Sequence, residues 1–151
     1  MTEPTTTVLT SGGRVQGFVE DGYEHWRGIP YAAAPVGPRR FRAPVAAETW
    51  EGVRPATAYG PAPWPTPFSR VFSRLPAEGK VSEDCLTINI TRRPSENTQR
   101  PVIVYLYGGG NRTGASSTYP GEGMVGDTDV IAVTFNFRIG VFGFLDLAGL
   151  E

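Results

Sequence analysis

The sequence predicts an α/β protein that is poor in helices and that holds only part of the layers such a fold requires. Residues 101–107 and 130–137 are continuous apolar runs, which are typical of strands covered on both faces of a sheet. No segment offers the amphipathic helices that would cover those faces. Glycine and proline together make up over a fifth of the 151 residues. This share, against an average of roughly 12%, favours many turns and few long helices.

The amino-terminal residues alternate between extended segments and turns. Residues 1–7 are polar, and we expect a flexible tail there, with the folded domain covering 8–151. Residues 8–10 and 14–20 are expected to pair as a hairpin around the glycine pair that separates them. A third strand is expected at 23–31. These short strands predict a small antiparallel region at the edge of the domain.

Residues 32–80, called the wrap from here on, carry nine prolines. Neither a helix nor a central strand tolerates that density. The segment is either a long surface loop or one pinned by the aromatic anchors Phe41, Trp50, Trp64 and Phe68. A structureless loop of this length is unusual in a small domain, and it favours a loop that packs on parts of a larger protein.

The second half of the chain returns to regular structure. We expect, in order, a strand within 82–92, a buried strand at 101–107, a Gly-rich loop at 108–117, one short helical turn within 120–128, a second buried strand at 130–137, and an apolar segment of ambiguous structure at 141–147. Central strands without covering layers predict a part of a fold, with apolar surface left exposed.

Composition excludes several classes of partner. The 14 basic and 15 acidic residues nearly balance, and no basic stripe suits nucleic acid. The sequence contains no apolar run of ~18 residues that predicts a membrane span, and no signal-peptide h-region follows Met1. Cys85 is the only cysteine, so no internal disulfide forms. We therefore expect a soluble cytoplasmic protein, and the preference for arginine over lysine suits a GC-rich bacterial genome.

Four blocks, in this order, resemble the type-B carboxylesterase and cholinesterase-like family. They are Trp26 to Ala32 with Pro35-Val36-Gly37 and Arg40-Phe41; Trp50 to Val53 with Ala58 to Pro61; Ser82 to Asn89; and Pro101 to Gly110 with Asn136 to Gly140 and Gly143-Phe144-Leu145. The resemblance covers nearly all of the chain from residue 13 on. It implies the amino-terminal part of an α/β-hydrolase fold, in a family that hydrolyses carboxylic esters with a Ser-Glu-His triad.

The triad itself has no counterpart in this sequence. The family's nucleophile elbow is Gly-x-Ser-x-Gly, whose small residues let a strained turn present the serine. Gly114-Ala115-Ser116 begins like that motif, but Thr118 stands where the closing glycine belongs. The only histidine, His25, lies far ahead of the family's catalytic base. We expect His25 to be a surface or hydrogen-bonded histidine of an edge strand, with a catalytic role as the alternative.

The Gly-rich loop carries the functional expectation. By resemblance, Gly109 and Gly110 donate backbone N–H groups to the oxyanion of the tetrahedral intermediate, and Gly108 and Asn111 contact substrate. Glycine allows both the inward turn of the amides and a close approach of substrate. Asn111 departs from the larger apolar residue frequent in the family. The alternative interpretation is a tight turn after a buried strand. A phosphate loop is a poor alternative, because the Gly-Lys-Ser/Thr ending is absent.

Several polar residues are expected to be structural. The resemblance implies a salt bridge between Arg40 and Glu83 that fastens the wrap, although Glu83 and Asp84 as paired catalytic carboxylates remain the alternative. The resemblance also implies a buried structural role for Arg138, with an acidic partner beyond Glu151.

Two further side chains have competing interpretations. Cys85 is expected to be a buried, inert thiol, since the cysteine that pairs with it in secreted relatives has no counterpart here. Trp64 is expected to anchor the wrap, with the lining of a ligand gorge as its alternative.

The functional hypothesis is a part of a serine carboxylic-ester hydrolase, inactive alone, whose substrate is a small-molecule carboxylic ester and which uses no metal or cofactor. The alternatives are a non-catalytic cholinesterase-like binding module and a subunit complemented by a second chain that carries the remainder of the esterase.

Overall fold

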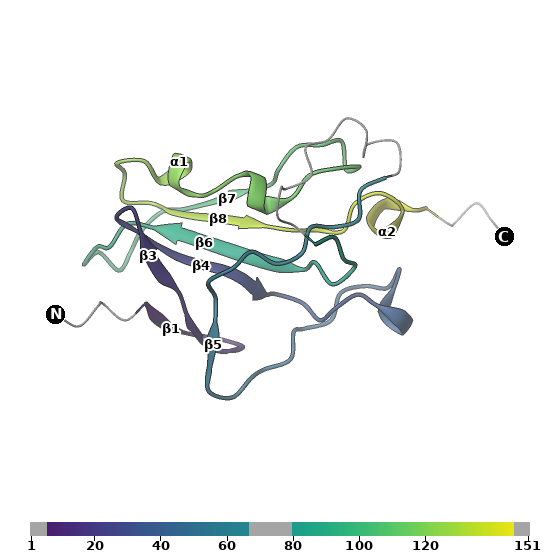
Figure 1. Ribbon diagram of the computed structural model, residues 1–151, viewed down its shortest axis with the longest axis horizontal. Helices are drawn as coiled ribbons and strands as arrows, with labels where there is room; N and C mark the ends of the chain where they lie inside the picture. Colours follow the sequence, from purple (N-terminus) through teal and green to yellow (C-terminus); the bar gives the residue numbers. More distant parts are fainter. Residues whose placement is uncertain (1–5, 67–79, 147–151) are drawn as a thin grey trace.

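A computed structural model of the chain describes residues 6–66 and 80–146, in which two sheets and a few short helices are present (Figure 1). The strands are β1 (Thr7–Thr10), β2 (Gly13–Gln16), β3 (Phe18–Glu20), β4 (Tyr23–Pro30), β5 (Val53–Pro55), β6 (Thr87–Arg92), β7 (Val102–Tyr105) and β8 (Ile131–Phe135). The helices are the 3₁₀ turns η1 (Gly37–Arg39) and η3 (Ser116–Thr118) and the short α1 (Glu122–Val125) and α2 (Val141–Phe144). The predicted helix-poor architecture is confirmed.

The amino-terminal hairpin is present, but its second strand is shorter than predicted. β1 pairs antiparallel with β2, and the chain then breaks at Gly17 before β3 pairs with β4 in the other sheet. A Cβ on Gly17 would lie 2.1 Å from the carbonyl oxygen of His25. Only glycine permits that close approach, so the predicted strand 14–20 divides between two sheets.

The predicted tail also ends earlier than expected. Thr7 opens β1, and Thr6 is buried. The carbonyl oxygen of Thr6 accepts hydrogen bonds from the indole N–H of Trp26 at 2.6 Å and from the backbone N–H of Gly17 at 3.1 Å. Residues 1–5 of the predicted tail lie outside the described residues.

The small sheet has the order β1-β2-β5, and the large sheet has the order β3-β4-β6-β8-β7. In the large sheet β4, β6 and β8 are mutually antiparallel, while β7 runs parallel to β8. A core of Val15, Trp26, Ile29 and Ala56 lies where the two sheets meet. This core joins the amino-terminal strands to β6, whose residues Ile88 and Ile90 pack against it.

Polar side chains line the more buried face of β6. Thr87, Asn89 and Thr91 are buried, whereas Ile88 and Ile90 on the opposite face are half-buried. The alternation of residues 82–92 predicted a strand, which the structure has from Thr87 onward. Residues 82–86 instead form tight turns, and the side chain of Asn89 becomes part of a buried hydrogen-bond network described below.

The strand β7 is exposed, and the prediction that both of its faces are buried is wrong for this chain. Val102 and Val104 are 56% and 54% exposed, and Leu106 just beyond them is 64% exposed. β7 is an edge strand of the large sheet, and no described helix covers its faces. The related prediction, that the chain lacks the covering layers and exposes apolar surface, is confirmed for the described residues. β8 is better covered, because it pairs on both sides.

The described part of the wrap is mostly irregular, as predicted, but it contains η1 and β5. Figure 1 shows the wrap leaving β4 and returning past the small sheet through β5, which pairs parallel with β2. Trp50 is an anchor: its indole N–H donates to the carbonyl oxygen of Arg14 at 2.8 Å. Phe41 stacks on Phe142 with ring centroids 6.0 Å apart. The predicted anchor Phe68 lies outside the described residues.

Candidate functional site

The Gly-rich loop, residues 108–117, follows the carboxyl end of β7, and it is called the oxyanion loop below after the role that the sequence predicts for it. Gly109 has φ +139°, and a Cβ there would lie 2.1 Å from the carbonyl oxygen of Thr113. Gly110 has φ +59°, with no atom within 4 Å of the position its Cβ would take. Glycine is therefore required at Gly109 by the lack of space, whereas at Gly110 the conformation favours glycine without requiring it.

Two exposed backbone N–H groups follow one another in this loop. The carbonyl oxygen of Gly109 accepts hydrogen bonds from the N–H groups of Arg112 and Thr113, which fold the loop back on itself. Among the described residues, no acceptor is paired with the N–H of Gly109 or Gly110. Two adjacent free donors at the end of a strand are suited to bind a negative oxygen from outside the chain.

The tip of the loop is held by two other segments. The carbonyl oxygen of Asn111 accepts from the N–H of Gly140 at 2.6 Å, and the carbonyl oxygen of Arg112 accepts from the N–H of Thr66 at 2.9 Å. Asn111 has φ +57°, a conformation that asparagine adopts more readily than other side chains do. This gives the departure from the family's apolar residue a conformational reason.

Tyr107 and Ser116, at the two ends of the loop, are both buried. Tyr107 stacks on Phe137 at 4.6 Å between ring centroids, and burial raises the pKa of Tyr107. Ser116 is 1% exposed, and its hydroxyl oxygen accepts from the side-chain amide of Asn89 at 2.9 Å. Ser116 is thus a buried hydrogen-bonding residue in this structure, which agrees with the absence of an elbow around it.

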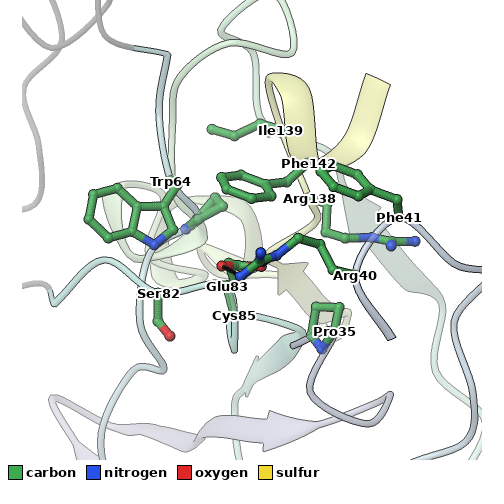
Figure 2. Close-up of a pocket in the computed structure, with 11 residues that line it drawn as sticks. Pro35, Arg40, Phe41, Trp64, Ser82, Glu83, Cys85, Arg138, Ile139 and Phe142 are labelled. Atoms are coloured by element: carbon green, nitrogen blue, oxygen red, sulfur yellow. Dashed lines mark hydrogen bonds and ion pairs between the residues drawn. The ribbon is translucent and has the colours of Figure 1, made fainter. Parts of the chain in front are cut away.

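Arg40 and Glu83 form the ion pair that the resemblance implies. Nε and Nη2 of Arg40 donate to the two carboxylate oxygens of Glu83 at 2.5 and 2.6 Å, in a fork geometry (Figure 2). Glu83 raises the pKa of Arg40. Asp84 lines a different surface depression from Glu83. The two carboxylates therefore do not face a common space as paired catalytic groups would.

A narrow crevice surrounds this ion pair between the wrap and α2 (Figure 2). Arg40, Phe41, Trp64, Cys85 and Phe142 are among the residues that line it. Its volume of about 10 Å³ holds at most one water molecule, so it is too small for an ester substrate.

Arg138, which also lines the crevice, is half-buried rather than buried. Its Nη1 donates to the carbonyl oxygen of Arg42 at 2.9 Å. The expectation of an acidic partner beyond Glu151 stays a prediction. Cys85 matches its prediction: it is free, 1% exposed, and burial raises the pKa of its thiol to about 12.

His25 lies inside the structure on β4, which has a neighbour on each side, so the surface position and the edge strand predicted for it are wrong, while the predicted alternative of a hydrogen-bonded histidine is confirmed. It is 0% exposed, and its Nδ1 is 3.2 Å from the hydroxyl oxygen of Thr91. Its Nε2 lies 3.5 Å from Oε1 of Glu122 on α1. Burial, with a contribution from Arg27, lowers the pKa of His25. β6 and β8 separate β4, which carries His25, from β7 and the oxyanion loop.

Sequence reasoning missed two buried asparagines, Asn89 and Asn136, which are 4% and 1% exposed. Both hydrogen-bond to Ser116 at the far end of the oxyanion loop. A signal was present, because Asn89 shares one side of β6 with Thr87 and Thr91. A strand with three polar residues on one side indicates a hydrogen-bonded interior or a wet surface, and the pattern alone does not distinguish them.

Comparison with known proteins places the chain in a family. The model of the carboxylesterase family matches residues 4–150. The chain belongs to the carboxylesterase family. It is 43% identical over 148 residues to the para-nitrobenzyl esterase of Bacillus subtilis (strain 168), covering 95% of this chain and 30% of that protein. It is 39% identical over 146 residues to the phenmedipham hydrolase of Pseudarthrobacter oxydans, covering 94% of this chain and 30% of that protein.

Solved structures agree with the family assignment. A para-nitrobenzyl esterase structure superimposes with a TM-score of 0.86 at 39% identity, covering 97% of this chain and 30% of the esterase. A Geobacillus stearothermophilus carboxylesterase superimposes with a TM-score of 0.81, covering 95% and 28%. The chain thus spans about 30% of the length of these relatives and forms the amino-terminal part of their α/β-hydrolase fold.

Other kinds of site find little support in the described structure. Within residues 6–66 and 80–146, no group of three or more His, Cys, Asp and Glu side chains is arranged to hold a metal ion. None of the helices in those ranges has the length and apolar character needed to cross a membrane.

Proposed function

We propose that this chain supplies the oxyanion-binding part of a serine carboxylic-ester hydrolase. The observation that carries the proposal is the pair of exposed N–H groups at Gly109 and Gly110, which have no acceptor among the described residues and stand at the carboxyl end of β7. In a sheet of this fold class, binding sites gather at the carboxyl ends of the strands. Membership of the carboxylesterase family supports the proposal that these donors bind the oxyanion formed from an ester.

During ester hydrolysis the carbonyl oxygen becomes negative when the nucleophile attacks. Donors already in place stabilise that charge, and the loss of one donor raises the barrier by ~3 kcal/mol. The open space beside Gly110 leaves room for the oxygen, and Gly108 and Asn111 would contact the substrate on either side of the donors. A third donor, the serine nucleophile and its Glu-His partners would come from sequence that these 151 residues do not contain.

The proposed substrate is a small carboxylic ester, and the proposed reaction needs neither metal nor cofactor. The serine oxygen attacks the carbonyl carbon, the alcohol leaves, and water then releases the acid from the acyl-enzyme. On this proposal, the isolated chain has no esterase activity, because the group that attacks the carbonyl is missing.

A chimera tests the proposal. In it, residues 4–150 of this chain replace the matched segment of the B. subtilis para-nitrobenzyl esterase, whose remaining part carries the nucleophile in the proposed scheme. Hydrolysis of para-nitrophenyl acetate is measured for the chimera and for the 151-residue chain alone. We expect serine-dependent turnover by the chimera and none by the chain. Turnover by the chain alone, or a folded but inactive chimera, would contradict the proposal.

A second candidate function follows from the exposed edge of β7. Val102, Val104 and Leu106 present apolar side chains beside unpaired strand backbone, which suits a second chain that carries the remainder of the esterase. Adding that remainder as a separate polypeptide would then restore hydrolysis. A non-catalytic binding module is the competing function, and a monomer with strong hydrogen-exchange protection across β7 would favour it. We place either form in the cytoplasm, since the single cysteine has no partner for a disulfide.

A further inference from the structure

The side chain of Asn136 lies at the centre of the hydrogen bonds that hold the oxyanion loop. Asn136 follows β8 directly and is 1% exposed. Its Oδ1 accepts from the backbone N–H of Ser116 at 2.8 Å, and its Nδ2 donates to the carbonyl oxygen of Pro61 at 2.9 Å. One amide thus joins the far end of the loop to the wrap.

The first of these bonds fixes the end of the loop. Ser116 lies two residues after Gly114. Gly114 packs so closely on Tyr107 that a Cβ on Gly114 would lie 2.6 Å from Cδ2 of the ring. The same Cβ position is 3.0 Å from the carbonyl oxygen of Gly108. The two ends of the loop are therefore in contact, so the position of Ser116 sets the geometry from which Gly109 and Gly110 project.

The second bond fixes a support for the tip. Pro61 lies in the wrap, and five residues later the N–H of Thr66 donates to the carbonyl oxygen of Arg112. An Nδ2 bond to Pro61 therefore holds the segment that in turn holds the tip.

The backbone of Asn136 begins a third support. Its own N–H donates to the carbonyl oxygen of Thr87, and its carbonyl oxygen accepts from the hydroxyl of Tyr31 at 2.7 Å. Four residues later, the N–H of Gly140 donates to the carbonyl oxygen of Asn111. Among the described residues, Asn136 thus bonds Ser116 directly and is linked through Pro61 and Gly140 to the segments that hold Arg112 and Asn111, while Asn89 also bonds the hydroxyl of Ser116.

We propose that Asn136 is a positioning residue for the oxyanion loop, whose side-chain amide holds the N–H groups of Gly109 and Gly110 in the orientation that binds the oxyanion. The inference rests on the proposed function, because it concerns how the same donors are held. An apolar residue at 136 would leave the buried N–H of Ser116 and the half-buried carbonyl of Pro61 without these partners. The loop would then move to find other partners, and the two donors would lose their fixed direction.

Nuclear magnetic resonance relaxation on the full 151-residue chain tests the inference. In the unaltered chain we expect backbone order parameters near 0.85 for Gly109 and Gly110, and below about 0.6 in Asn136→Leu, with β6 and β8 unchanged. Asn136→Asp keeps the acceptor that faces Ser116 and should restore order. Tyr23→Phe is the control, since it removes a hydroxyl that hydrogen-bonds Gly126, outside this network.

Asn136→Ser provides a second variant in case the leucine side chain prevents folding. Its short hydroxyl cannot span Ser116 and Pro61, so the same loss of order is expected. The inference would be overturned if the order parameters of Gly109 and Gly110 were low in the unaltered chain. It would also be overturned if they stayed high in both Asn136→Leu and Asn136→Ser. An equal loss of order in Tyr23→Phe would overturn it as well.

The chimera described above separates this inference from the proposed function. There, Asn136→Leu should lower kcat by tenfold or more with little change in KM, because a loosened donor pair binds the transition state less well while ground-state binding is retained. An active chimera whose kcat is unaffected by Asn136→Leu overturns only the role of Asn136. A folded, inactive chimera made from the unaltered chain overturns the proposed function, whatever the relaxation data show.

Discussion

Alanine substitution should destabilise the chain more at Gly109, where a Cβ has no room, than at Gly110, where the space is open. Gly110 and Gly37 have nearly the same φ, +59° and +54°, and neither has an atom within 4 Å of the position a Cβ would take. Alanine in this conformation costs roughly 1–2 kcal/mol of stability, so Gly110→Ala and Gly37→Ala should destabilise equally. Gly109→Ala adds contact with the carbonyl oxygen of Thr113, at roughly 1–3 kcal/mol more.

The assays are urea unfolding of the 151-residue chain and hydrolysis by the chimera. Gly109→Ala should reduce kcat on the order of 100-fold, because the loop can no longer present its donors. Gly37→Ala should leave kcat unchanged, since η1 is not part of the proposed site. Equal effects of Gly109→Ala and Gly37→Ala on both stability and kcat would refute the reasoning.

Three further outcomes follow from the structure. The pKa of buried His25 is lowered, so on acidification the unfolded chain takes up a proton near pH 6.5 before the folded chain does. The stability of the folded chain should therefore fall as the pH drops below 6.5, and equal urea midpoints at pH 7.5 and 5.5 would contradict this. Cys85 should react with a thiol reagent only after unfolding, because burial raises its pKa to about 12; rapid labelling of the folded chain would show that the thiol is reachable. Val104→Lys should reduce aggregation measured by light scattering, because Val104 is 54% exposed at a free strand edge, and it should change stability by no more than ~0.5 kcal/mol. Unchanged aggregation would show that this edge does not promote association.

Much of the strand layout could be predicted from the sequence, because local signals determine it. Turn residues mark the amino-terminal hairpin, alternation marks β6, and apolar runs mark β7 and β8. The burial of Cys85 and the Arg40–Glu83 pair also agree with expectation. These features depend on short motifs or on the family resemblance.

The features that sequence reasoning missed depend on contacts between distant segments. The division of strand 14–20 results from the approach of Gly17 to the carbonyl of His25, which no local pattern contains. Histidine burial likewise requires Thr91 and Glu122 to meet His25 from other elements. Apolar composition indicates that β7 can be buried, but only the presence of a neighbour buries it.

The candidate site was only partly visible in the sequence, for the same reason. The glycines of the oxyanion loop could be found because their motif is local. Their supports could not, since Asn136 reaches Ser116 and Pro61 across 20 and 75 residues of sequence. Buried amides of this kind resemble surface asparagines until the fold shows what surrounds them.

A crystal structure of the chimera with a phosphonate bound to its nucleophilic serine tests the central claim most directly. The phosphonate carries a negative oxygen where the tetrahedral intermediate has one. The account predicts that oxygen within about 2.7–3.1 Å of the backbone nitrogens of both Gly109 and Gly110. A phosphonate oxygen turned away from both nitrogens, and held by other groups, would contradict the assignment of this loop as the oxyanion hole.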